Sequence, residues 1–133
     1  MARDLPRPTD AELEILTVLW SRGPSSVRDV HEAISRRRPA QYSTVLKFLQ
    51  IMAEKGLVRR NEEQRAHIYE AAQPREWTER QLAGDLLKRA FGGNPARLLI
   101  GALSSRRASK KELAEIRELL EEYGKTKSKK GKS

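Results

Sequence analysis

The chain has 133 residues, of which 27 are lysine or arginine and 18 are acidic, so its formal net charge is +9. This length fits one domain, or a small domain with an appendage, and the positive charge favours nucleic acid or an anionic membrane surface as partner. The lack of cysteine excludes disulfides and thiolate sites, and with only two histidines we expect no metal and no cofactor. No apolar run reaches the roughly 20 residues that a membrane helix needs, so we expect a cytoplasmic protein without membrane insertion.

The first forty residues predict two helices. Thr9 and Glu12 have the spacing of a capping box, and apolar residues follow it at helical intervals up to Gly23. Ser25 or Ser26 is expected to cap a second helix, which ends before Pro39 because proline disfavours helical backbone in the residue before it. The apolar face of the first helix consists of Leu13, Leu16, Leu19 and Trp20, widened by Ile15 and Val18, and that of the second consists of Val27, Val30 and Ile34.

A third helix is predicted from about Gln41 to Lys55, with Gly56 in the left-handed position that commonly follows a helix. At 100° per residue its side chains divide into two arcs. The apolar arc consists of Tyr42, Val45, Leu46, Phe48, Leu49, Met52 and Ala53, and the opposite arc consists of Ser43, Thr44, Lys47, Gln50, Ile51 and Glu54. One face is therefore expected in the core and the other in solvent.

Residues 57–60 and 65–69 predict two strands joined by a turn at 61–64, which together form a basic hairpin. The order of three helices and then a hairpin is the layout of a winged helix. The fold class expected is mainly α: an N-terminal winged helix-turn-helix with a two- to three-stranded antiparallel wing, followed by a C-terminal helical dimerisation region.

The composition changes after residue 72. Three further helices are predicted, the first ended by Gly92–Gly93, the second opened by Asn94–Pro95, and the third capped by Ser109 and closed by Gly124. The last nine residues hold five lysines, which account for +5 of the net +9, and are expected to be disordered. The predicted domains are residues 6–72 for DNA binding, 73–123 for dimerisation and 124–133 as a lysine-rich tail.

The start of the third helix carries residues suited to DNA recognition. The major groove admits an α-helix, and short or bidentate side chains near its start read the base edges. The candidate readers are Gln41, Tyr42, Ser43, Thr44, Lys47 and Ile51, with Tyr42 on the packed arc offering its hydroxyl to a phosphate and Ile51 contacting a thymine methyl. The alternative is the solvated face of an ordinary helix.

Basic residues elsewhere are candidates for contacts with the DNA backbone, which supply affinity without reading sequence. The candidates are Arg28, Arg60, Arg65 and His67, with Arg59 beside them in the wing. The alternative is an exposed hairpin whose charge Glu62 and Glu63 partly neutralise. We predict no catalytic residues and no metal site.

The C-terminal helices hold too few apolar residues for a core of their own and more than a linker needs. We expect a second copy of the chain to cover them, because a two-fold dimer reads a pseudo-palindromic site. The dimerisation candidates are Leu86, Phe91, Leu99, Leu103, Ile116 and Leu120. The alternative is that these helices fold back on the winged helix.

Five segments together resemble the penicillinase repressor family, which includes the β-lactamase and methicillin-resistance repressors and the copper-responsive CopY repressors. They are residues 11–20, 26–31, 42–45, 56–58 and 67–69. The resemblance covers about residues 6–123 and implies a homodimeric repressor that binds operator DNA and leaves it on an inducing signal. It also implies that the helix with Tyr42, Thr44 and Lys47 is the recognition helix.

The chain departs from that family in two ways. It lacks the paired cysteines of the copper sensors, and residues 99–103 do not match the Asn-Phe cleavage site of members released by a sensor protease. A protease or another inducing partner therefore remains open. Two alternative functions are a winged-helix module that binds a protein, and an architectural protein that binds DNA mainly through its lysine tail.

Overall fold

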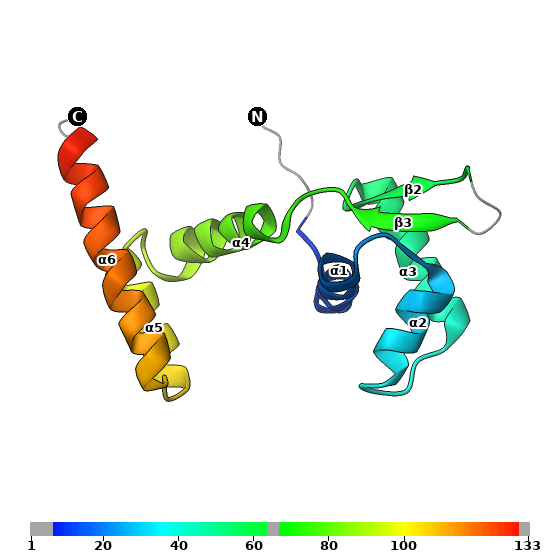
Figure 1. Ribbon diagram of the computed structural model, residues 1–133, viewed down its shortest axis with the longest axis horizontal. Helices are drawn as coiled ribbons and strands as arrows, with labels where there is room; N and C mark the ends of the chain where they lie inside the picture. Colours follow the sequence, from blue (N-terminus) through cyan, green and yellow to red (C-terminus); the bar gives the residue numbers. More distant parts are fainter. Residues whose placement is uncertain (1–6, 64–66, 131–133) are drawn as a thin grey trace. The chain divides into compact units, whose positions relative to one another are not determined.

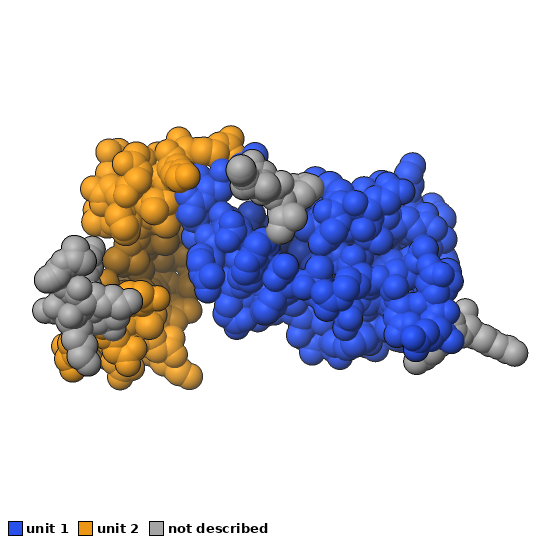
Figure 2. All heavy atoms as spheres, turned by 90° about the horizontal axis from the view of Figure 1, so that it is seen from above, with its two compact units in different colours: residues 1–85 blue, residues 86–133 orange. Residues whose placement is uncertain are grey.

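The computed structural model describes residues 7–63 and 67–130, with side chains described as far as residue 125. The chain divides into two compact units, residues 1–85 and 86–133 (Figure 2). The elements run in the order α1 (Asp10–Arg22), β1 (Ser25–Ser26), α2 (Val27–Ser35), α3 (Tyr42–Lys55), β2 (Val58–Asn61), β3 (Ile68–Ala71), α4 (Arg75–Ala90), α5 (Pro95–Ser105) and α6 (Lys110–Lys130) (Figure 1). The unit boundary lies within α4, whereas the predicted domain boundary at residues 72–73 precedes that helix.

Both α1 and α2 begin with a capping box. Thr9 and Glu12 form the predicted one, in which the Thr9 hydroxyl accepts from the Glu12 amide and the Glu12 carboxylate accepts from the Thr9 amide. At α2 the cap is Ser26, paired reciprocally with Asp29. Ser25 instead turns its hydroxyl back to the carbonyl of Gly23 and lies buried in β1. These caps satisfy helix amides that would otherwise lack a partner.

The wing is a three-stranded antiparallel sheet in the order β1-β3-β2, which confirms the expected two to three strands. The returning strand begins at Ile68 and pairs Arg60 with Tyr69 and Val58 with Ala71. Of the predicted strand 65–69, His67 precedes β3, and residues 65–66 lie outside the described residues. Burial explains this register, since Val58 and Tyr69 are 2% and 0% exposed, and a shift of one residue would turn them away from the core.

A single apolar core holds α1, α2, α3 and the wing together. It contains most of the predicted apolar residues of the three helices and the inward side chains of β2 and β3. Its buried members are Ile15, Leu16, Val18, Leu19, Val27, Val30, Ile34, Val45, Leu49, Met52, Val58 and Tyr69. Because burial of one such side chain stabilises the fold by roughly 1.5–3 kcal/mol, the helix-turn-helix and its wing are stabilised as one body.

The start of α4 and the residues just before it contact Trp20 of α1. The indole Nε1 of Trp20 donates to the carbonyl of Gln73 at 2.9 Å, and the Arg75 guanidinium lies 5.7 Å from the centre of the Trp20 ring. Thr78, one turn further, is buried. The start of α4 therefore belongs to the same body as the winged helix.

The second unit consists of the end of α4 with α5 and α6. No described side chain of α5 or α6 is buried. The predicted end of α6 at Gly124 is wrong, since the helix continues to Lys130. Gly124 does not adopt the left-handed conformation that ends a helix, and lysine is a good helix former that also complements the negative C-terminal end of the helix dipole.

In the part of the chain that the structure describes, no helix is both long enough and apolar enough to cross a membrane.

Candidate nucleic-acid interface

Helix α3 presents one buried face and one solvent face, as the sequence predicts. On the buried side Val45 is 3% exposed, and Leu49 and Met52 are fully buried. The side chains of the opposite face are exposed: Ser43, Thr44, Lys47, Gln50 and Glu54, with Ile51 at 37%. Four of the candidate readers therefore share one accessible surface, namely Ser43, Thr44, Lys47 and Ile51.

The first turn of α3 differs from its predicted arrangement at one residue. Gln41 is the N-cap and is exposed, and its side chain makes no capping hydrogen bond. Tyr42 was expected on the packed arc, which is wrong, since it is 48% exposed. The reason is its place as the first residue of α3, beyond the apolar core; there its ring lies edge-to-face with the His31 ring, with ring centres 5.7 Å apart. Tyr42 thus borders the solvent face of α3.

His31 fixes the turn that leads into α3. Its Nε2 lies 2.9 Å from the carbonyl oxygen of Ala40, so the proton is on Nε2 and the ring donates to the turn. Since Ala40 directly precedes the N-cap Gln41, this bond sets where the helix begins. His31 is a structural residue, as its place beside an apolar stripe indicates.

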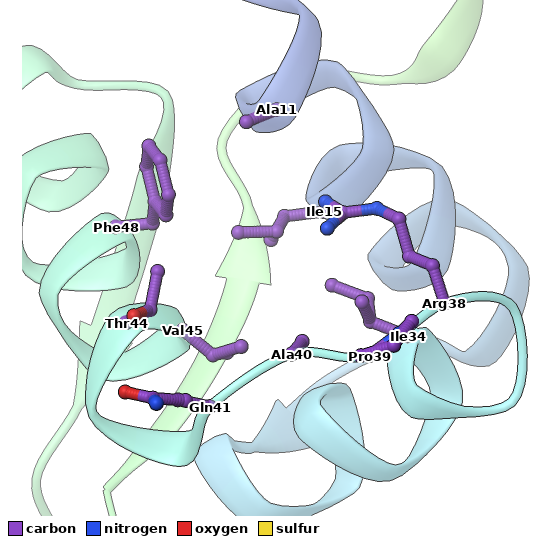
Figure 3. Close-up of a pocket in the computed structure, with 10 residues that line it drawn as sticks. All are labelled: Ala11, Ile15, Ile34, Arg38, Pro39, Ala40, Gln41, Thr44, Val45 and Phe48. Atoms are coloured by element: carbon purple, nitrogen blue, oxygen red, sulfur yellow. The ribbon is translucent and has the colours of Figure 1, made fainter.

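A hollow of about 400 Å³ lies beside the first turns of α3 (Figure 3). Its inner wall is formed by core residues from three helices, Ile15, Ile34 and Val45, and Figure 3 shows Gln41 and Thr44 at its α3 side. Arg38 borders it from the turn after α2 and is held by Glu14 through hydrogen bonds of 2.6 and 3.2 Å. Two candidate readers therefore also line a partly apolar concavity.

The wing presents arginines that already have acidic neighbours. Arg59 pairs with Glu70 at 3.3 Å. Arg60 lies beside the Tyr69 hydroxyl and Glu62, which together raise the pKa of its guanidinium and keep it charged. His67 is exposed just before β3, and Arg65 lies outside the described residues. In α2, the Arg28 side chain is 81% exposed and loosely paired with Glu32 at 3.5 Å.

Sequence reasoning missed the ion pair at the far end of α3. The Nζ of Lys55, the last residue of the helix, donates to both carboxylate oxygens of Glu12 at 2.9 Å. Burial raises the pKa of the Glu12 carboxyl, but the Thr9 amide and the Lys55 ammonium together outweigh burial, so its pKa lies below 4.5. The pair joins residues 43 positions apart, a separation that no local pattern reveals.

This ion pair predicts a specific acid sensitivity. A carboxyl whose pKa is lower in the folded chain stabilises the fold above its unfolded pKa and stops doing so as pH falls through its folded pKa. We therefore expect Glu12→Gln to be less stable than the parent chain at pH 7, and the difference to shrink as pH falls below 4.5. Thermal unfolding of both chains between pH 7 and pH 3 measures this. A difference that stayed constant across that range would contradict it.

Residues 8–122 match the family model described as penicillinase repressor. The transcriptional regulator BlaI of Mycobacterium tuberculosis is 47% identical over 66 residues, which cover 49% of this chain and 48% of that protein. The chain thus spans about half the length of that relative.

Two further matches extend the comparison. The penicillinase repressor of Bacillus licheniformis is 22% identical over 121 residues, covering 91% of this chain and 94% of that protein. The solution structure of the Bacillus licheniformis BlaI monomeric form in complex with the blaP half-operator is 23% identical, with a TM-score of 0.49, covering 56% of this chain and 92% of that one.

Proposed function

Because the chain belongs to the penicillinase repressor family, a family of transcriptional repressors and not of enzymes, we propose that it represses transcription by binding operator DNA. The observation that carries the proposal is the two-sided helix α3, whose polar face is exposed directly after a tight turn. A helix of this kind fits the major groove, and the wing that follows it offers arginines to the phosphates.

In this proposal the residues of α3 have separate roles. Gln41 pairs with adenine, Lys47 reaches guanine or a phosphate, and Ser43 and Thr44 bond to bases or phosphates. Ile51 contacts a thymine methyl, a role suited to an apolar side chain that is 37% exposed in the middle of a polar face. Tyr42, exposed at the start of the helix, offers its hydroxyl to the backbone.

Contacts outside α3 would supply affinity rather than sequence preference. We assign Arg28, Arg60, Arg65 and His67 to the phosphates or the minor groove. Arg60 and Arg28 each have a carboxylate partner in the free chain, Glu62 and Glu32 respectively, so DNA has to compete with those pairs. Because both pairs are solvent-exposed and such pairs contribute little, phosphate is able to replace the carboxylate.

The protein in this proposal is a homodimer that acts in the cytoplasm. The supporting observation is the apolar surface of the second unit, where exposed leucines line helices without a described buried side chain. A second copy would cover Leu86, Phe91, Leu99, Leu103, Ile116 and Leu120 and place two recognition helices on a pseudo-palindromic operator. An inducing signal releases the dimer. Because this chain has no cysteine, that signal is not copper bound to its own thiolates.

The test compares one proposed reader with one proposed phosphate contact. From a library of random duplexes, the parent protein should select a two-fold site, with a protected region of roughly 20–30 base pairs for half-sites one turn or more apart. Lys47→Ala should lose about 5- to 100-fold in preference for the selected site over scrambled DNA, as expected for one base contact. Arg60→Ala should weaken binding to both duplexes alike and reduce the salt dependence by about one phosphate contact.

Two outcomes would contradict this function. The first is a parent protein that selects no sequence from the library. The second is a Lys47→Ala variant that keeps its sequence preference while losing the capture of a protein partner, because α3 would then be a protein-binding surface.

Deletion of residues 125–133 serves as a further control, and we expect only a modest loss of DNA affinity from it.

A further inference from the structure

Glu12 is a buried carboxylate with more partners than its capping role requires. It is 2% exposed, although a capping glutamate needs only one backbone amide and functions at a helix surface. Its Oε1 accepts from the Thr9 amide at 2.9 Å, and both its oxygens accept from Lys55 Nζ at 2.9 Å. The burial and the second partner are therefore not explained by capping α1.

Lys55 lies at the joint between α3 and the wing. It is the last residue of α3, Gly56 follows in the left-handed conformation with φ of 84°, and β2 begins at Val58. The Lys55 side chain is only 29% exposed, because it reaches to the first turn of α1. Glu12 is almost fully buried, so breaking the pair would leave a desolvated carboxylate, which is strongly unfavourable; the pair therefore holds the last residue of α3 against the first turn of α1.

The remaining contacts of α3 restrict it less. At its start, His31 donates to Ala40 just before the N-cap. Between the two ends the helix is held by apolar packing of Val45, Leu49 and Met52, and the hydrophobic effect that drives this packing has no direction. The Glu12–Lys55 pair is thus a directional side-chain contact that joins the wing end of α3 to α1, beside the backbone hydrogen bonds from Gly56 to Ala53 and from Leu57 to Met52 that close the helix.

We propose that Glu12, acting through Lys55, is a positioning residue for DNA recognition, which holds the wing end of α3 against α1. This proposal rests on the proposed function, because it assigns Glu12 to the alignment of the proposed recognition helix. Glu12 itself is buried at the start of α1 and is not placed to contact DNA directly. Binding constellations require side chains held within about 0.5 Å, so a less firmly held α3 reduces sequence preference before it reduces affinity for phosphates.

The experiment measures the ratio of affinities for a duplex selected by the parent protein and for a scrambled duplex of the same length. Fluorescence anisotropy gives this ratio for Glu12→Gln, Lys55→Met and the double variant. We expect each single variant to lower the ratio about tenfold, the equivalent of one base contact, with binding to the scrambled duplex unchanged within about twofold. The double variant should be no worse than either single one, since both remove the same contact. Lys55→Arg, which retains the charge, should keep the parent ratio.

Two control variants separate positioning from a general loss of stability. Glu112→Gln is the matched change in the second unit, because Glu112 also accepts from a capping amide, that of Ser109, and pairs with an arginine, Arg106. Val18→Ala weakens the core of the first unit without removing a charge. Both should keep the parent ratio at a temperature where they are folded.

The outcomes distinguish the two proposals. If the parent protein prefers no duplex, the proposed function fails, and the positioning role fails with it. If the parent protein prefers the selected duplex and Glu12→Gln keeps the same ratio, only the positioning role is overturned. It is also overturned if Val18→Ala lowers the ratio as much as Glu12→Gln does, since the effect would then follow from stability alone.

Discussion

In the proposed homodimer, Leu120→Asp should separate the two copies and lower the affinity for a full operator by at least about 100-fold. Leu120 is 60% exposed on α6, and helical spacing places Leu113, Ile116 and Tyr123 on the same face. A carboxylate buried in that face without a partner is strongly unfavourable, so the two copies separate. The monomer then loses the gain in effective concentration that two linked half-site contacts provide.

The same substitution should leave the DNA-binding unit intact. Every buried residue of the apolar core lies between Ile15 and Tyr69, in the first unit. We therefore expect Leu120→Asp to bind a half-operator duplex as tightly as the parent monomer does. Analytical ultracentrifugation gives the oligomeric state, and anisotropy on full and half operators gives the two affinities.

A matched control lies on the opposite face of α6. Glu118 is two residues from Leu120 and, at 100° per residue, points well away from the apolar stripe. Glu118→Ala should therefore remain a dimer with parent affinity. The proposal that a second copy covers this surface would not survive a Leu120→Asp variant that stays dimeric and binds the full operator as the parent chain does.

Local patterns in the sequence were sufficient to predict the presence of all six helices and, for α1, α2 and α3, most of the face that each buries. The Thr9–Glu12 capping box and the left-handed Gly56 are confirmed, because each depends only on residues within a single turn. The two arcs of α3 are confirmed for the same reason, since a period of 3.6 residues assigns Leu49 inward and Lys47 outward without knowledge of the partner surfaces.

Features that depend on distant residues were not predicted. Tyr42 falls on the apolar arc by its period, but the packing of the three helices leaves this first residue of α3 outside the apolar core, in contact with His31 of α2. The Glu12–Lys55 pair depends on how α1 and α3 pack, and Glu12 already had a sufficient local explanation as a capping residue. The start of β3 at Ile68 was missed because the burial of Tyr69 against the helices, not the turn composition, fixes the register.

Two substitutions two residues apart on α3 should separate folding from recognition. Leu49 is fully buried, so Leu49→Ala should lower the free energy of unfolding by about 2–5 kcal/mol through lost burial and a cavity. That is a large share of the total, since a unit of this size has a stability of roughly 4–13 kcal/mol. Ile51 is 37% exposed, so Ile51→Ala should change stability by less than about 0.5 kcal/mol.

The effects of the two substitutions on sequence preference should be the reverse of their effects on stability. At a temperature where it remains folded, Leu49→Ala should keep the sequence preference of the parent protein, because its side chain lies on the core side of α3. Ile51→Ala should lose a preference of about fourfold for a site with thymine at the contacted position over one with uracil, which lacks the methyl group, since burial of one methyl-sized group contributes about 0.8 kcal/mol. Urea denaturation and anisotropy on the two duplexes measure the two effects separately. If Ile51→Ala retained the preference for thymine, Ile51 would be an exposed apolar residue without a part in recognition, and the reading face would be limited to the polar side chains around it.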